Sequence, residues 1–296
     1  MRPEQLRALV GERVLLLDGG MGSLLMAAGL EHGRAPEWWN VEHPERVEAA
    51  HRGYVEAGSD IVHTNTFGAS PPKLKTAGLG GRCREINGLA VAIARRAVVD
   101  STLVAGDVGP TGLTLPPVGR ATVEELAEAY REQVAALAEA GADLISIETM
   151  YDLREALAAV AAARTTGLPV LASMTFEARK RGFFTIMGDP LGASLAALGE
   201  AGADAVGCNC SVTSSVMVGM VAEARRFVSA PIIAQPNAGN PRVTPEGTAY
   251  DASPEGFARD VLAMAEAGAR LVGGCCGTTP EFIARARATL TAKGVA

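Results

Sequence analysis

One five-residue pattern occurs four times in this 296-residue chain and narrows the choice of fold. In each copy Glu-Ala-Gly is followed by Ser or Ala and then by Asp or Arg, at 56–60, 139–143, 200–204 and 266–270. Each copy follows an alanine-rich stretch and precedes a short apolar run. The glycine suits the left-handed conformation that ends a helix. Each copy is therefore predicted to join a helix to a strand.

The spacing of the copies leaves room for about two strand–helix units in each interval, since one unit needs about 30 residues. Apolar runs predict eight strands, at 14–18, 61–64, 103–107, 144–148, 170–175, 205–209, 232–235 and 271–274. Helices are predicted between them, for example at 44–57, 123–140, 153–164, 254–267 and 280–290. Thr122 and Glu125 have the spacing of a capping box at one helix start.

Strict alternation of strands and helices implies parallel strands joined by right-handed crossovers. Eight such units close most simply into a barrel, and about 250 residues is the usual size. No Gly/Ser- or Pro-rich linker divides the chain. We therefore predict an α/β protein made of a single (β/α)8 (TIM) barrel domain over 1–296.

Composition and charge exclude several classes of protein. Hydrophobic residues make up 48% of the chain, which argues against disorder. The net charge is −6 and no run of Lys or Arg occurs, so no nucleic-acid partner is expected. The first 12 residues do not resemble a signal peptide, and no apolar window approaches 18 residues. We expect a cytoplasmic protein without a membrane partner.

Polar residues collect where the predicted strands end, which is where barrel enzymes carry their active sites. Glu148 ends an apolar strand inside the barrel and is placed to bind an ammonium group, because an unpaired carboxylate is costly there. Asp18 precedes two glycines and is either a site residue or a turn residue, and the same two alternatives hold for Asp107. His63 is interpreted as a hydrogen-bonded core histidine rather than a metal ligand.

The cysteines give the most specific signal. Cys275 and Cys276 are adjacent, between glycines, at the end of the eighth predicted strand, and a third thiol could come from the end of the sixth. Three thiolates leave a zinc ion one open position, as in catalytic sites. The alternative is that these cysteines are small buried hydrophobes, which is the interpretation preferred for Cys83. Cys208 and Cys210 have the same parity on the strand, so parity does not choose between them, but Cys210 lies at the rim.

The motifs resemble those of a known family. Gly-Cys-Asn-Cys at 207–210 and Gly-Gly-Cys-Cys-Gly-Thr-Thr-Pro at 273–280 resemble the zinc-binding signature of the homocysteine S-methyltransferase family. Shorter motifs at 18–22, 64–69, 109–112, 147–149 and 236–239 are similar to the family in the same order, over 15 to about 288. The likeness is greatest to the homocysteine-binding module of cobalamin-dependent methionine synthases.

The resemblance implies a barrel that holds one Zn²⁺ through Cys210, Cys275 and Cys276 and binds the thiol of homocysteine on the metal. It also implies that the amino-acid group of homocysteine is held near Asp18, Gly19 and Glu148. Asn65 and Thr66, in the motif at 64–69, are further candidate substrate contacts. The chain is therefore predicted to be a zinc-dependent homocysteine S-methyltransferase that forms methionine, since the thiolate is the nucleophile and metal coordination removes the thiol proton.

The methyl donor is open at this point. The chain has no Asp-x-His-x-x-Gly cobalamin signature, so a methylated corrinoid would have to come from a partner protein. A docking surface for such a partner is predicted around the open end of the barrel, from the loops 29–40, 179–188 and 237–250. The second loop contains an apolar cluster that is a candidate protein contact, a lid over a small donor or plain packing, formed by Phe183, Phe184, Ile186 and Met187. S-methylmethionine, S-adenosylmethionine or glycine betaine are alternative donors, and another thiol is an alternative acceptor. A non-catalytic alternative is a zinc-stabilised scaffold.

Overall fold

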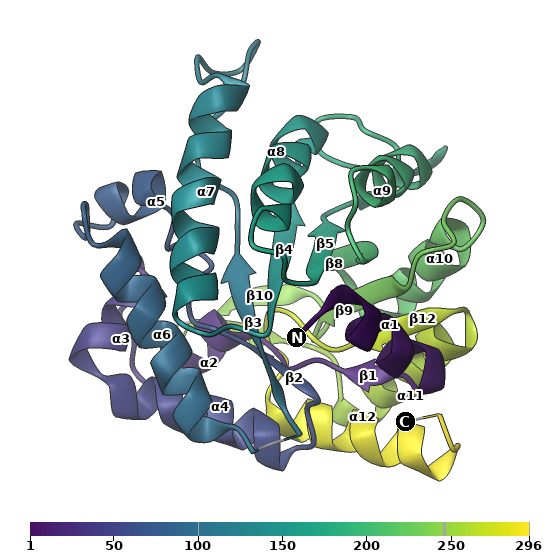
Figure 1. The fold of residues 1–296 in the computed structure, drawn as a ribbon. Coiled ribbons are helices and arrows are strands. Elements are labelled where there is room, and N and C mark those ends of the chain that lie inside the picture. Colours follow the sequence, from purple (N-terminus) through teal and green to yellow (C-terminus); the bar gives the residue numbers. More distant parts are fainter. Residues whose placement is uncertain (100, 245–246, 296) are drawn as a thin grey trace.

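Eight parallel strands form one sheet that curves into a barrel in the computed structural model, which describes residues 1–99, 101–244 and 247–295 (Figure 1). A parallel bridge between Leu17 and Ile61 joins the two edges of the sheet. The predicted (β/α)8 barrel is confirmed, and all eight predicted strands are present. In sheet order they are β1 (Leu15–Leu16), β12 (Ala269–Val272), β9 (Ile232–Asn237), β8 (Ala205–Thr213), β5 (Val170–Met174), β4 (Leu144–Met150), β3 (Leu103–Val108) and β2 (Ile61–His63).

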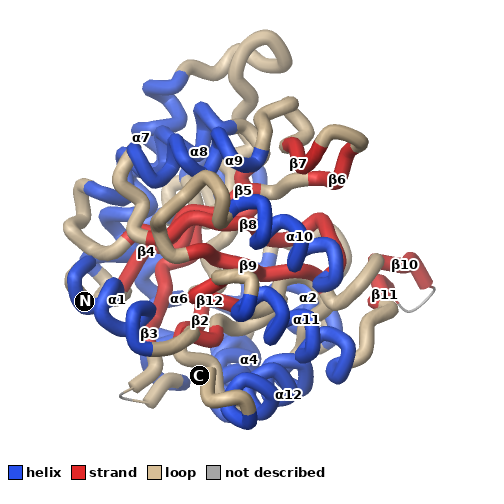
Figure 2. The backbone as a smooth tube through the Cα atoms, turned by 90° about the vertical axis from the view of Figure 1, so that its right-hand side faces the viewer, coloured by secondary structure: helices blue, strands red, loops and turns tan. Residues whose placement is uncertain are grey.

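Helices surround the sheet, as the two views of the backbone show (Figures 1 and 2). The five helices named from the sequence are all present, with ends within two residues of those predicted. Thr122 and Glu125 form the predicted capping box, with Thr122 Oγ1 accepting from the Glu125 amide at 3.1 Å. The helices are α1 (Pro3–Glu12), α2 (Met21–Ala27), α3 (Trp39–Glu42), α4 (Pro44–Glu56), α5 (Pro71–Thr76), α6 (Cys83–Ala97), α7 (Val123–Glu139), α8 (Leu153–Arg164), α9 (Leu191–Glu200), α10 (Ser214–Ala224), α11 (Pro254–Glu266) and α12 (Pro280–Ala292), with a 3₁₀ turn at Pro36–Trp38.

The repeated five-residue pattern joins helix to strand as predicted. Its four glycines have φ between 95° and 110°, which favours glycine. The aspartates of three copies have a second role, because each carboxylate accepts a hydrogen bond from the amide of a residue on another strand. Asp60 accepts from Leu16 at 2.7 Å, and Asp143 accepts from Val104 at 2.8 Å. The pattern therefore fixes strand pairing as well as helix ends.

The interior of the barrel has two layers. The lower layer, at the end where the strands begin, is apolar, and the upper layer, at the end where they finish, is polar. Side chains that alternate along the strands, such as Leu15, Ile61 and Leu144, pack together in the lower layer. Helix α1, which the sequence analysis did not predict, covers this end with Leu6 and Val10. The polar layer lies at the opposite end, where the strands finish, so ligands approach the barrel from that end.

The segments after β1, β5 and β9 add structure at the open end. The predicted loop 29–40 contains the 3₁₀ turn and the start of α3, and the predicted loop 237–250 contains the hairpin β10 (Pro241–Thr244) and β11 (Gly247–Tyr250). A second hairpin, β6 (Glu177–Arg179) and β7 (Gly182–Phe184), follows β5, and Figure 2 shows both hairpins extending from the barrel.

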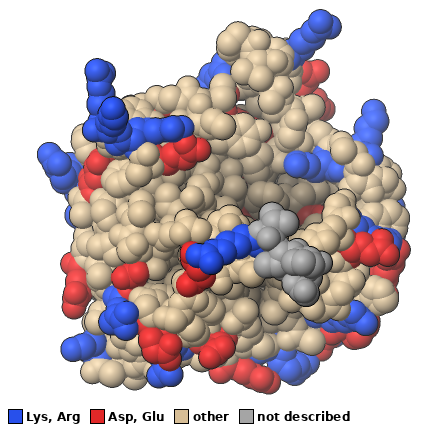
Figure 3. Space-filling model, turned by 180° about the vertical axis from the view of Figure 1, so that it is seen from behind, with Lys and Arg blue, Asp and Glu red and all other residues tan. Residues whose placement is uncertain are grey.

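The surface carries both signs of charge. On the face seen in Figure 3, acidic and basic side chains are interspersed, most of them around the edge, with uncharged residues over much of the rest. No helix in the described part of the chain combines the length and the apolarity that crossing a bilayer requires.

Candidate metal centre and acceptor pocket

Three cysteine thiols meet at the open end of the barrel. Within the described residues, the Sγ atoms of Cys210, Cys275 and Cys276 all lie within 4.8 Å of one another, and Cys210 Sγ is 3.9 Å from Cys276 Sγ. In a tetrahedral site with zinc–sulfur bonds of about 2.3 Å, neighbouring sulfurs lie about 3.8 Å apart. The three thiols therefore fit one zinc ion, with a fourth position left for a ligand. Cys83 and Cys208 are buried elsewhere.

The backbone of β8, rather than strand alternation, brings Cys210 into this group. Asn209 is fully buried and contacts residues of β4 and β5, while Cys208 packs in the outer core between sheet and helices. Simple alternation would send Cys210 the same way as Cys208. Cys210 and Ser211 instead have φ of 60° and 61°, a left-handed conformation that is uncommon for residues with a side chain. This turn redirects the thiol toward the barrel mouth.

The loop after β1 packs closely under the paired cysteines. A Cβ atom added to Gly20 would lie 2.6 Å from the carbonyl oxygen of Cys275, so only glycine fits there. The Gly20 amide donates to the carbonyl of Thr278 at 3.1 Å, and Ser23 Oγ accepts from the Gly277 amide at 3.0 Å. The Asp-Gly-Gly motif and the Gly-Gly-Cys-Cys-Gly motif therefore form one structural unit.

The three thiols influence one another strongly. Hydrogen bonds from Cys275 and Cys276 lower the pKa of Cys210 to about 3, because two thiol donors stabilise one thiolate. The hydrogen bonds to Cys210 in turn raise the pKa of Cys276 to about 12. A bound divalent cation favours the ionised form of every thiol that it contacts. The cluster is thus suited to holding a cation by thiolate ligation.

A cavity of about 380 Å³ lies beside the thiols. It contains seven of the eight site residues predicted from the sequence, all except Asp18. Within the described residues, its lining includes no Lys or Arg. The lining consists of Gly19, Gly20, Met21, Gly22, Ser23, Met26, Pro36, Glu37, His63, Thr64, Asn65, Thr66, Phe67, Asp107, Glu148, Thr149, Cys210, Gln235, Tyr250, Gly274, Cys275 and Cys276.

Glu148 lines this cavity near the end of β4. Burial raises the pKa of its carboxyl group to about 7, and the imidazole of His63 opposes that shift. Burial disfavours the ionised form of a carboxyl group, so a cationic partner bound beside Glu148 would stabilise its carboxylate strongly. The structure therefore places Glu148 where the sequence predicted it, facing a cavity that also contains the thiols.

Asp18 does not line the cavity. Its side chain is 1% exposed, its Oδ1 lies 2.6 Å from Nδ1 of His63, and its Oδ2 accepts from the His63 amide at 2.8 Å. Nε2 of His63 lies 3.1 Å from Oγ of Ser146. Burial opposes protonation of His63, but its pKa is raised to about 10 by the charge and the hydrogen bond of Asp18. Asp18 and His63 thus form a buried ion pair.

Asn65 and Thr66 line the cavity while most of their hydrogen bonds hold the protein together. Asn65 Nδ2 donates to the carbonyl of Pro36 at 2.8 Å and to Oδ1 of Asn40 at 3.0 Å. Thr66 Oγ1 donates to the carbonyl of Asp107 at 2.7 Å. Both residues therefore shape the wall that faces the thiols.

Several residues of the cavity are not among the site residues predicted from the sequence. Tyr250 comes from β11 and lines the cavity together with the three thiols. Burial, and next to it the neighbouring Cys276 thiol, raise the pKa of Tyr250 to about 12. Gln235 and Thr149 also line the cavity. Gln235 could have been found from alternation along β9, because Ile233 two residues earlier faces the barrel interior. Tyr250 was placed only as the last residue of the predicted loop 237–250, without a role of its own.

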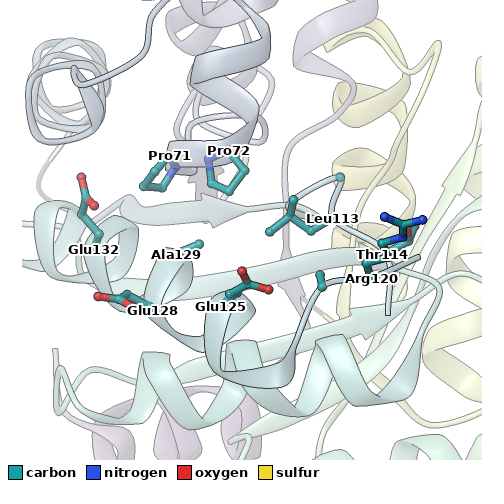
Figure 4. Close-up of a pocket in the computed structure, with 11 residues that line it drawn as sticks. Pro71, Pro72, Leu113, Thr114, Arg120, Glu125, Glu128, Ala129 and Glu132 are labelled. Carbon is teal, nitrogen blue, oxygen red and sulfur yellow. The ribbon is translucent and has the colours of Figure 1, made fainter. Parts of the chain in front are cut away.

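A larger hollow of about 710 Å³ lies away from the thiols, between α5 and α7 (Figure 4). Its acidic side chains, Glu125, Glu128 and Glu132, come from one side of α7, opposite Pro71 and Pro72. Glu125 is already bonded to Thr122 in the capping box. The described residues that line this hollow include no cysteine or histidine, so it does not share the chemistry of the thiol centre.

The fold and this site define a class of protein, the (β/α)8 barrels with a three-cysteine centre at the open end. The family follows from sequence comparison. Residues 15–290 match the family model described as homocysteine S-methyltransferase, and the chain belongs to that family. The match supports a methyltransferase.

Two of the similar proteins are much longer than this chain, and another has about the same length. The chain is 34% identical to a methionine synthase of Mycobacterium tuberculosis and 33% identical to one of Mycobacterium leprae, with 93% of this chain but only 24% of each relative covered. It therefore spans about a quarter of their length. The metallated form of the homocysteine methyltransferase MmuM of Escherichia coli is 28% identical, with a TM-score of 0.80 and coverage of 96% of this chain and 99% of that one. The carboxyl transferase domain of Rhizobium etli pyruvate carboxylase, at 15% identity and a TM-score of 0.54, shares the fold alone.

Proposed function

We propose that this chain transfers a methyl group to the thiol of homocysteine, giving methionine, with one zinc ion held by Cys210, Cys275 and Cys276. The observation that carries the proposal is the meeting of three thiols with Glu148 in one cavity. The membership of the chain in the homocysteine S-methyltransferase family supports it. A zinc ion bound there would ionise the acceptor thiol at neutral pH.

The residues of the chain would position the acceptor for an in-line displacement. Glu148 is suited to bind the ammonium group of the acceptor at one side of the cavity. The three cysteine thiols would hold the zinc ion at the other side, where the acceptor sulfur lies. The acceptor sulfur attacks the methyl carbon, and the bond from that carbon to the donor breaks with its electron pair leaving on the donor. Holding both reactants in line lowers the barrier by several kcal/mol, on the order of what intramolecular reactions gain.

For the donor, a methylated corrinoid protein acting in trans is the first candidate. The likeness to methionine synthases favours it, as does an exposed apolar surface at the open end. The exposed fractions of Ile186 and Met187, which follow the β6–β7 hairpin, are 71% and 38%. Phe183 belongs to the predicted cluster but packs against the core beside α10, so it is not part of this surface.

A small cationic donor, such as S-methylmethionine, S-adenosylmethionine or betaine, is the second candidate. Two observations favour it. MmuM, a homocysteine methyltransferase, and this chain match each other over nearly their whole lengths. The lining of the cavity has carboxylates but, in the described residues, no Lys or Arg, and its one imidazole, His63, is already paired with Asp18. A cationic donor fits such a lining.

One assay separates these candidates. Zinc-loaded protein would be mixed with homocysteine and, in turn, methylcobalamin, a methylcorrinoid protein, S-methylmethionine, S-adenosylmethionine and betaine, and methionine would be measured. We expect methionine from the corrinoid donors. Turnover with a sulfonium or betaine alone would establish the second candidate. Absence of methionine with every donor, or equal turnover of unrelated thiols, would refute homocysteine as the acceptor.

A further inference from the structure

A second hollow at the open end of the barrel shares no lining residue with the cavity beside the thiols. It lies between the loop after β3, the start of α8 and the segment after β7, and has a volume of about 220 Å³. Pockets for drug-sized ligands have about 300–1,000 Å³, so this hollow suits a group about as large as an amino-acid side chain. It is called the Glu155 hollow here. Most of its lining is apolar or aromatic, and its acidic side chains are Asp152 and Glu155.

The rim of the Glu155 hollow is apolar and exposed. The exposed fractions of Val118 and Ile186 are 69% and 71%, and that of Met187 is 38%. Tyr151, which is half-buried, also lines the hollow. Exposing large apolar side chains to water is unfavourable, and groups of them often mark contacts with other proteins. A small solute in the hollow would cover little of this rim, whereas a bound protein would cover most of it.

Glu155 lines the hollow with one carboxylate oxygen in use and the other free. The residue is 2% exposed. Its Oε1 accepts three hydrogen bonds, from the Thr111 amide at 2.9 Å, the Thr111 hydroxyl at 2.7 Å and the Tyr130 hydroxyl at 2.8 Å. Its Oε2 has no partner among the described residues, yet it is not one of the atoms that are sealed from solvent. The small exposed part of Glu155 therefore includes Oε2, and this oxygen is reached from the hollow.

The charge of Glu155 has no cation beside it. Within the described residues Glu155 forms no ion pair, and the lining of the hollow includes no Lys, Arg or His, while Asp152 is already paired with Arg154 at 2.6 Å. The first turn of α8, which contains Glu155, supplies only a partial positive charge. Burial, and next to it the charge of Glu155, raise the pKa of Tyr151 and of Tyr130 above the ordinary value. A cation at Oε2 would therefore be favourable.

We propose that the Glu155 hollow binds a Lys or Arg side chain of a partner protein, with the cationic group at Oε2 and apolar neighbours of that side chain on Val118, Ile186 and Met187. Lys and Arg carry their charge on an apolar stem, which matches a carboxylate reached through an apolar rim. Arg is also enriched among the residues that anchor protein contacts, in pockets ringed by contacts that exclude water. The proposal is independent of the acceptor and of the methyl donor, because the hollow shares no residue with the acceptor cavity.

The test uses two short peptides that differ in one charged group. Acetyl-Leu-Arg-Leu-amide, and the same peptide with neutral citrulline in place of arginine, would be titrated into wild-type protein and Glu155→Gln, and NMR would follow the isotope-labelled methyl groups of Ile186 and Met187. We expect wild type to bind the arginine peptide at least about 5-fold more tightly than the citrulline peptide, since a hydrogen bond between two charged groups is lost with citrulline. Glu155→Gln should remove most of that preference.

The controls separate binding from folding. Glu155→Gln keeps an acceptor at Oε1 for Thr111 and Tyr130 and changes only the other atom, so it should melt close to wild type. Glu128→Gln, at an exposed carboxylate on α7 outside the hollow, should bind both peptides like wild type. If Glu155→Gln does not fold, Val118→Ser at the exposed rim replaces it, and this variant should bind the arginine peptide about 2- to 3-fold more weakly because apolar contact is lost.

Three results would overturn the inference: no binding of the arginine peptide, equal affinities of the two peptides for wild type, or an arginine preference that is unchanged in Glu155→Gln. n-Butylguanidinium is the last arm, because it carries the cation and the stem without the apolar neighbours. It should bind more weakly than the arginine peptide. If it binds as tightly, the rim makes no contact, and the assignment of the hollow to a protein partner is wrong.

Discussion

The side-chain amide of Asn209 forms two hydrogen bonds with Thr149 across the open end of the barrel. Its Oδ1 accepts from the Thr149 amide at 2.8 Å, and its Nδ2 donates to the Thr149 hydroxyl at 2.7 Å. Thr149 directly follows Glu148 and has a left-handed φ of 61°, while Asn209 directly precedes Cys210. Asn209 thus connects the acceptor-binding carboxylate proposed here with the thiol centre.

Asn209→Ala is expected to weaken both ends of the site. The Thr149 amide loses its partner, and the 3.9 Å contact from Asn209 Nδ2 to Cys275 Sγ disappears. We expect zinc affinity to fall about 10- to 100-fold, as when groups behind metal ligands are removed. Competition with a chromophoric chelator measures this. Ser173→Ala is the control, because Ser173 donates only to Oδ1 of Asn209. Equal zinc affinity in Asn209→Ala and wild type would contradict the prediction.

The fold was predictable because its signals are local. The repeated Glu-Ala-Gly pattern and the apolar runs specify helix ends and strands, and eight alternating units leave few alternatives to a barrel. Helix α1 was missed because it precedes the first strand and belongs to no strand–helix unit. Its role depends on packing of Leu6 and Val10 under the barrel, which no local pattern shows.

The site was only partly predictable. The paired Cys275 and Cys276 could be placed because they are adjacent at a strand end. The thiol of Cys210 does lie with theirs, as the sequence analysis expected, but its direction depends on a left-handed backbone that the sequence does not reveal. The sequence analysis predicted Asp18 as a substrate contact and left Asp107 between a site role and a turn role, but Asp107 lines the cavity and Asp18 does not. What distinguishes the two aspartates is the contact of Asp18 with His63, which lies on another strand and leaves no local signal in the sequence.

Metal content tests the ligand set directly. Wild-type protein should contain about one zinc per chain, and Cys210→Ala, Cys275→Ala or Cys276→Ala should lose most of it, because two thiolates hold zinc far less well than three. Elemental analysis after dialysis measures this. Cys208→Ala and Cys83→Ala are the controls and should keep zinc, with a loss of stability on the order of 1 kcal/mol from the small cavity. A zinc-free Cys208→Ala, or a fully loaded Cys210→Ala, would show the ligand set to be wrong.

Glu148→Gln should separate acceptor binding from metal binding. The substitution keeps the shape of the side chain and removes its charge, so zinc should stay while homocysteine binds about 10-fold or more weakly. Calorimetric titration measures the affinity. Glu128→Gln, at an exposed carboxylate on α7, is the control and should bind homocysteine normally. If both variants bound homocysteine like wild type, Glu148 would not be an acceptor contact.

Stability should fall in mild acid because of His51. The residue is fully buried in α4, neither ring nitrogen has a partner among the described residues, and burial lowers its pKa from 6.5 to about 4. Between these pH values the unfolded chain binds a proton at His51 that the folded chain does not. The contribution of His51 to the free energy of unfolding is therefore fully present above pH 6.5 and is lost as the pH falls toward 4. His51→Leu should reduce this decrease by up to about 3 kcal/mol. Urea unfolding of both proteins across this range gives the slopes, and parallel slopes would rule out His51 as the cause.

The donor can be tested at the exposed apolar surface. Ile186→Asp should slow methyl transfer from a methylcorrinoid protein several-fold, since a charge is placed in a protein contact, and leave transfer from free methylcobalamin unchanged. Initial rates with the two donors measure this. Val99→Asp is the control, because Val99 is 58% exposed and follows α6 at the other end of the barrel. Equal slowing with both donors would place Ile186 in the path of small donors and argue against docking.

The left-handed backbone at Cys210 and Ser211 matters to anyone who wishes to transplant this centre. Three cysteines copied onto another barrel by strand register alone would send the third thiol into the layer between sheet and helices, where Cys208 lies here. A graft must carry the turn along with the cysteine, together with the two hydrogen bonds from Asn209 to Thr149 at the end of β4, two strands away in the sheet. The unit to transplant is therefore a set of backbone conformations with their supporting hydrogen bonds. The three cysteines can converge only once that backbone is in place.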